Sequence, residues 1–158
     1  MSTKLLIANI LSENNLTLSI AESCSAGGIS SEICSVPGSS SYFMGGVIAY
    51  SNKSKRRDLN VEDTSIKKFT EVSSEVAVQM SEGIKERFST DFSLSTTGYA
   101  GPNGKDVGKV YISVSSPSKT EVKKFFFEGD RKEITDKIIE ESIQFLFSEI
   151  KLHISNDK

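Results

Sequence analysis

Histidine is nearly absent from this chain, and its scarcity limits the chemistry that the protein can perform. The only histidine, His153, lies five residues from the end and beyond the last helix that the apolar pattern predicts. A Ser-His-Asp or Cys-His catalytic system needs an imidazole to move protons. A catalytic zinc site usually takes at least one histidine. We therefore expect no metal, and we expect a hydrolytic base, if there is one, to be Lys, Tyr, Asp or Glu.

Cysteine, long apolar runs and excess charge of one sign are also scarce. Cys24 and Cys34 are too far apart for a C-x-x-C redox or zinc motif. No apolar run is long enough to cross a bilayer, and the first residues turn polar after Ile7. The net charge of −2 gives no whole-chain attraction to nucleic acid. We therefore expect a cytoplasmic protein with neither a membrane nor a nucleic-acid partner.

The overall composition is that of an ordinary globular protein. The chain has 158 residues, of which 37% are hydrophobic and 25% are charged. These fractions are typical of soluble domains, and the length fits one domain with a sizeable core. We find no repeat, low-complexity segment or internal linker, so residues 1–158 are expected to form a single domain.

Apolar periodicity predicts alternating helices and strands. Helical spacing appears over residues 3–14, 26–33, 52–58, 73–88 and 131–150. Strand patterns cover residues 16–20, 45–50, 92–96, 109–114 and 122–127. The 45–50 segment is expected to be buried, and the last two strands form a hairpin around residues 116–119. Helices between strands predict a three-layer α/β/α sandwich, and the hairpin predicts a mixed, mostly parallel sheet.

Three polar loops follow predicted strands, at the edge where open α/β sheets bind ligands. The Ala21–Gly28 loop opens a helix, so its backbone N–H groups can hold an anion, although Ser23 or Ser25 can equally serve as a simple helix cap. In the second loop, Tyr50 and Lys55 are either an acid/base pair or surface side chains. The third, residues 98–104, is either a phosphate cradle or an ordinary glycine-rich turn.

Taken together and in order, these segments resemble the CinA C-terminal domain family, whose stand-alone members are nicotinamide-nucleotide amidohydrolases. The resemblance runs from about Leu5 to Leu146. It is carried by AESCSAGG, VPGSSSYFMGGVIAYSNKSK, EVSSEVA, TTGYAGPNG, VGKVYISV and FEGDR. The chain departs from the family pattern at Ala26, Ser74 and Tyr99, and its loop from Asn103 to Val107 is shorter.

The resemblance implies a function and a site. The function is conversion of nicotinamide mononucleotide to nicotinic acid mononucleotide and ammonia, in pyridine nucleotide salvage, by a homodimer without a cofactor. Ser23 would be the nucleophile, with Tyr50 and Lys55 as acid/base partners. Arg131 is a phosphate ligand in this interpretation. The substrate-binding residues would be Ser25, Gly27, Ser39, Ser40, Gly46, Asn52, Thr97, Gly98, Ala100, Gly101 and Arg131.

This chemistry is feasible without histidine. A lysine at its reference pKa of about 10.4 is almost fully protonated at neutral pH, so Lys55 must be buried and must have cationic neighbours. Arg56 and the positive ring of the substrate are the candidates for those neighbours. Backbone N–H groups over residues 25–28 are expected to hold the oxyanion.

Two alternatives remain open from the sequence. The first is a non-catalytic nucleotide-binding or competence-associated adaptor module. The second is an amidase that uses Cys24 as its nucleophile, although a cysteine without a histidine partner is more often a buried structural residue.

Overall fold

The computed structural model describes residues 1–158 and shows six α-helices and five strands. Along the chain the elements are α1 (Thr3–Glu13), β1 (Leu18–Glu22), α2 (Gly28–Cys34), β2 (Phe43–Ile48), α3 (Asn52–Leu59), α4 (Asp63–Phe69), α5 (Ser74–Phe88), β3 (Phe92–Gly98), β4 (Lys109–Ser115), β5 (Thr120–Phe126) and α6 (Arg131–Asn156). A short 3-10 turn, Ser39–Ser41, precedes β2.

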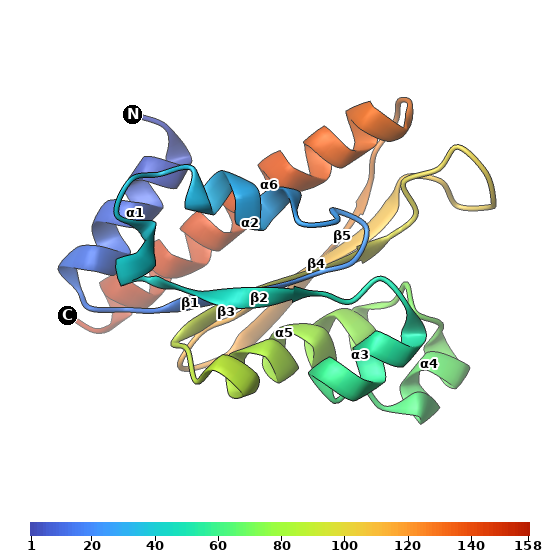
Figure 1. Cartoon of the computed structure of the whole chain (residues 1–158), viewed down its shortest axis with the longest axis horizontal. Coiled ribbons are helices and arrows are strands. Elements are labelled where there is room, and N and C mark those ends of the chain that lie inside the picture. Colours follow the sequence, from blue (N-terminus) through green and yellow to red (C-terminus); the bar gives the residue numbers. More distant parts are fainter.

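The strands form one sheet in the order β2-β1-β3-β4-β5. Strand β1 is parallel to both β2 and β3, whereas β4 is antiparallel to both β3 and β5. All strands except β4 therefore point the same way. Helices α1, α2 and α6 cover one face, and α3, α4 and α5 lie on the other (Figure 1). This confirms the predicted α/β/α sandwich, the mixed sheet and the final hairpin.

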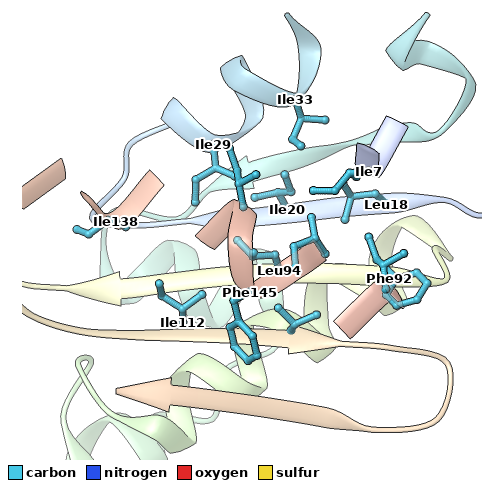
Figure 2. Close-up of a cluster of buried hydrophobic side chains, with 14 of the residues drawn as sticks. Ile7, Leu18, Ile20, Ile29, Ile33, Phe92, Leu94, Ile112, Ile138 and Phe145 are labelled. Carbon is cyan, nitrogen blue, oxygen red and sulfur yellow. The ribbon is translucent and has the colours of Figure 1, made fainter. Parts of the chain in front are cut away.

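The larger core lies between the sheet and the α1, α2 and α6 layer (Figure 2). Strand β3 shows why the two faces differ. Its alternation places Phe92 and Leu94 in this larger core, while Ser93 and Ser95 point toward α5. There the two serine hydroxyls donate to carbonyl groups of α5, so each buried polar group has a partner.

Several predicted boundaries are wrong in informative ways. Helix α2 begins at Gly28, two residues later than expected, because Ala26 and Gly27 adopt left-handed backbone angles, with φ of +50° and +93°. Strand β2 is not buried as a whole, since it is the edge of the sheet and exposes Met44 and Ile48.

The C-terminal helix is also longer than predicted. Helix α6 continues to Asn156 and contains His153, which was expected beyond the helix. The imidazole packs edge-to-face on Phe92, with ring centroids 5.4 Å apart, and contacts Asp157. His153 is thus a packing residue at the end of the core. No helix combines the length and the apolar character that crossing a membrane requires.

Candidate active site

A cavity of about 400 Å³ opens where three parallel strands end. Ser23 directly follows β1, Tyr50 follows β2, and Gly98 ends β3. After β1 the chain continues to α2 on one face of the sheet, and after β2 it continues to α3 on the other face (Figure 1). The loops that follow these strands therefore meet at the carboxyl ends of the strands. The lining residues are Ser23, Cys24, Tyr50, Asn52, Lys55, Glu71, Val72, Thr97, Gly98, Tyr99, Ala100, Gly101, Asn103 and Arg131.

Ser23 and Lys55 are in direct contact at the base of this cavity. The Nζ atom of Lys55 lies 2.9 Å from Oγ of Ser23 and 2.9 Å from the carbonyl oxygen of Ala49. Both side chains are buried, and Lys55 is only 2% exposed. Helix α3 produces this placement: a capping box between Ser51 and Ser54 fixes its start. Lys55 then falls on the inward face, one turn before Leu59.

Burial makes Lys55 a better base than an ordinary lysine. Removal from water lowers the pKa of the Lys55 amine, because desolvation disfavours the ammonium form. A Cys24 thiolate, when that group is deprotonated, and the carboxylate of Glu71 act in the opposite direction. Once neutral, the amine has a lone pair and can accept the proton of the Ser23 hydroxyl across the same 2.9 Å contact.

Cys24 shows the opposite behaviour. Its thiol is buried, and desolvation raises its pKa to about 12. A hydrogen bond from Thr96 and the nearby Lys55 only partly offset that effect. The thiolate is the nucleophilic form of cysteine, so at neutral pH this side chain is an unreactive neutral thiol.

The turn after Ser23 offers fewer free N–H groups than expected. The buried Glu22 carboxylate already accepts hydrogen bonds from the Ile29 and Ser30 N–H groups, each at 2.9 Å. The N–H groups of Ala26 and Gly28 bond back to carbonyls within the turn. Only the N–H groups of Cys24, Ser25 and Gly27 have no acceptor in the protein, and of these residues only Cys24 lines the cavity.

Tyr50 lies at the rim and makes no hydrogen bond with Ser23 or Lys55. Its ring is largely exposed, and its hydroxyl accepts a hydrogen bond of 3.0 Å from Nη2 of Arg131. The same guanidinium donates to the carbonyl oxygen of Gly101. Arg131 therefore connects the start of α6 to two loops of the cavity. The group in contact with Ser23 is Lys55 rather than Tyr50.

The structure brings most of the predicted site residues together. Nine of them line the cavity: Ser23, Tyr50, Asn52, Lys55, Thr97, Gly98, Ala100, Gly101 and Arg131. Five do not: Ser25, Gly27, Ser39, Ser40 and Gly46. Arg56 also lies elsewhere, since it pairs with Asp63 at 2.7 Å on the exposed side of α3, and it therefore does not serve as the expected cationic neighbour of Lys55.

The five residues outside the cavity have structural surroundings. Ser25 shares a hydrogen bond with Oγ1 of Thr96 at 2.8 Å. Gly27 takes the left-handed conformation that starts α2. Ser39 and Ser40 precede β2, at the strand end opposite the cavity. At Gly46 a Cβ atom would lie 2.2 Å from the carbonyl oxygen of Ile20, so the tight β1–β2 pairing requires glycine.

The sequence interpretation missed four lining residues as site members: Glu71, Val72, Tyr99 and Asn103. Tyr99 and Asn103 lie in the 98–104 loop that the sequence offers as a phosphate cradle, but neither is predicted there as a binding residue. Glu71 and Val72 lie in the connection between α4 and α5, and helix α4 was not predicted at all. The EVSSEVA segment that begins at Glu71 is part of the family resemblance, but nothing in it singles out Glu71 or Val72 as site residues.

Comparisons with known proteins agree with this architecture. A competence or damage-inducible protein from Enterobacter asburiae superposes with a TM-score of 0.91 at 28% identity, covering 94% of this chain and 96% of the other. A CinA-like protein from Kosmotoga olearia is 41% identical over 145 residues, and one from Flavobacterium psychrophilum is 36% identical over 151 residues.

The two CinA-like proteins are longer than the region that matches this chain. The two CinA-like proteins are matched over 89% and 93% of this chain but over only 35% and 36% of their own lengths. The chain thus spans about a third of the length of these curated relatives. The model of the CinA C-terminal domain matches residues 2–150. With the whole sheet and nearly all of both helical layers inside that match, the chain belongs to the CinA C-terminal domain family.

Proposed function

We propose that this protein is an amidohydrolase that converts nicotinamide mononucleotide to nicotinic acid mononucleotide and ammonia. One observation carries the proposal: the amine of a buried lysine lies 2.9 Å from a serine hydroxyl at the base of a polar cavity. Burying a lysine is costly unless its charge is compensated or removed. Lowering the pKa of Lys55 makes it the base that a serine nucleophile needs when no histidine is nearby.

In the proposed reaction, Lys55 takes the proton of Ser23 while Oγ attacks the carboxamide carbon. The resulting oxyanion is placed near the free N–H of Cys24. The Lys55 ammonium then gives its proton to the amide nitrogen, ammonia leaves, and an ester with Ser23 remains. Lys55 next deprotonates a water molecule, which attacks the ester and releases the carboxylic acid as Ser23 regains its proton.

The remainder of the cavity matches the rest of this substrate. Its volume falls within the usual range for small-ligand sites. Arg131, at the rim with Gly98 and Gly101, is the proposed ligand for the 5′-phosphate. In this proposal the enzyme acts in the cytoplasm as a homodimer and requires no cofactor.

Ammonia release from nicotinamide mononucleotide by the purified protein tests the proposal. We expect turnover that EDTA leaves unchanged, and we expect Ser23→Ala to abolish it. Lys53→Met is the matched control, because Lys53 lies on the exposed side of the same helix. Binding of the nucleotide without any turnover would instead support a non-catalytic nucleotide-binding or competence-associated module. Strong inhibition by EDTA that zinc reverses would contradict the serine–lysine mechanism.

A further inference from the structure

Only one carboxylate lines the cavity. Of the 14 lining residues, three carry charged side chains: Lys55, Arg131 and Glu71. Glu71 is half-buried and lies between α4 and α5. Its backbone carbonyl accepts a hydrogen bond of 2.6 Å from Oγ1 of Thr97, which ties this segment to the end of β3. Its carboxylate has neither an ion-pair partner nor a hydrogen-bond donor in the protein, whereas the other two charged groups are both hydrogen-bonded.

The unpaired carboxylate works against the proposed base. Burial lowers the pKa of Lys55, and the negative charge of Glu71 opposes this by favouring the ammonium form. Cys24 does not contribute in this way at neutral pH, since its own pKa of about 12 keeps it uncharged. An acidic group beside a lysine base is therefore unfavourable for catalysis in the empty site, and a positive charge on the ligand would offset it.

We propose that Glu71 is the counter-charge for a cationic aromatic ring and selects N-alkylpyridinium amides over uncharged amides. This inference rests on the proposed function and assigns the part of the cavity that recognises the ring. With the carboxamide at Ser23, Arg131 at the rim faces the phosphate, and Glu71 is the remaining charged group to face the ring. Tyr50 and Tyr99 line the same cavity, and aromatic rings also attract cations.

A second consequence follows for Lys55. When a cationic ring lies against Glu71, the negative field that favours the Lys55 ammonium is offset. The bound cation therefore promotes the neutral, basic amine in the complex in which the base is needed. An uncharged amide in the same position leaves Glu71 uncompensated, so Glu71 acts against such ligands in both binding and turnover.

Matched ligands can test this charge selection. Nicotinamide mononucleotide and its dihydro form share the phosphate, the ribose and the carboxamide, but only the first has a positively charged ring. We would measure both dissociation constants by calorimetry in a Ser23→Ala background, with and without Glu71→Gln. We expect Glu71→Gln to weaken binding of the cationic nucleotide about tenfold and to leave the dihydro form within about twofold. Glu75→Gln, an exposed neighbour on α5, should change neither value.

The outcomes separate this proposal from the proposed function. Equal weakening of both nucleotides, or weakening of neither, would overturn the role of Glu71 as a counter-charge. If neither nucleotide binds, the proposed substrate is wrong, and the pair 1-methylnicotinamide and nicotinamide then tests the site alone. A preference for the 1-methylnicotinamide cation that Glu71→Gln removes supports the charge selection without the nucleotide. Absence of that preference overturns it.

Discussion

Replacing Lys55 with methionine separates the catalytic role of this lysine from its cost to the fold. Methionine preserves an unbranched apolar stem but has no amine. The substitution removes two hydrogen bonds, to Ser23 and to the Ala49 carbonyl, each worth about 0.5–1.5 kcal/mol. It also removes the penalty for burying an ammonium group, which is several kcal/mol after relaxation. We therefore expect the free energy of unfolding of Lys55→Met at pH 7 to equal that of the unmodified protein or to exceed it by up to about 3 kcal/mol.

The cost of burying the Lys55 ammonium should appear as a pH dependence of the free energy of unfolding. Since the folded-state pKa of Lys55 lies below its unfolded value, the unfolded chain binds more protons between these two values. The free energy of unfolding of the unmodified protein should consequently rise with pH across that window, by at most about 1.4 kcal/mol per pH unit for one proton. The rise ends near the ordinary lysine value, and the advantage of Lys55→Met should shrink over the same range.

Urea unfolding at several pH values between 7 and 10, followed by circular dichroism, measures both effects. Lys53→Met controls for loss of an exposed positive charge on the same helix and should behave like the unmodified protein. Amidase activity of Lys55→Met should fall by a factor of about 10²–10⁴ or more, the usual contribution of a general base. A variant that is several kcal/mol less stable at pH 7, with no convergence at high pH, would refute the idea that Lys55 is buried at a cost for catalysis.

Three further predictions concern residues around the pair. Ser23→Ala should lower kcat by several orders of magnitude with little change in nucleotide affinity, whereas Cys24→Ala should lose at most about tenfold; the reverse pattern of kinetics would assign the nucleophile to the thiol. Arg131→Ala should impair use of the nucleotide much more than use of nicotinamide riboside, and equal effects on kcat/KM would show that the anion site is elsewhere. Glu22→Ala should destabilise the fold by about 2–5 kcal/mol, because it leaves two N–H groups of α2 without an acceptor; urea unfolding showing less than about 1 kcal/mol would contradict this anchoring role.

The sequence predicted the layers well because two periods are clear in it. Alternation in β3 separates apolar Phe92 and Leu94 from Ser93 and Ser95, and the four-residue spacing in α5 and α6 identifies their buried faces. Helix α4 was missed since its seven residues contain only one buried apolar side chain, Ile66, and this is too little to show a period. The edge position of β2 could not be predicted from the sequence either, because it depends on which strands pair rather than on the composition of β2.

The site was only partly predictable for a related reason. Lys55 belongs to a basic cluster with Lys53, Arg56 and Arg57, which reads as a solvated helix face, and only Lys55 in that cluster is buried. The family resemblance identified Lys55 as an acid/base residue. Within the cluster itself one signal agrees with this: Leu59 lies four residues later, so the two share the inward face. Glu71 begins the EVSSEVA segment of the resemblance, but that segment does not single it out, since its place in the cavity depends on α4 and α5 both packing beside the sheet.

The contact between the proposed nucleophile and base is fixed by strand pairing rather than by a flexible loop. The Ala49 N–H donates to the carbonyl of Glu22 at 2.7 Å, which joins the ends of β1 and β2 one residue before Ser23. The Ser23 N–H donates to the Thr96 carbonyl of β3 at 3.2 Å. The carbonyl of the same Ala49 receives the Lys55 amine. Ser23 and Lys55 are thus located relative to one backbone residue at the sheet edge, so their geometry is established before substrate arrives, and such preorganisation lowers the barrier to proton transfer.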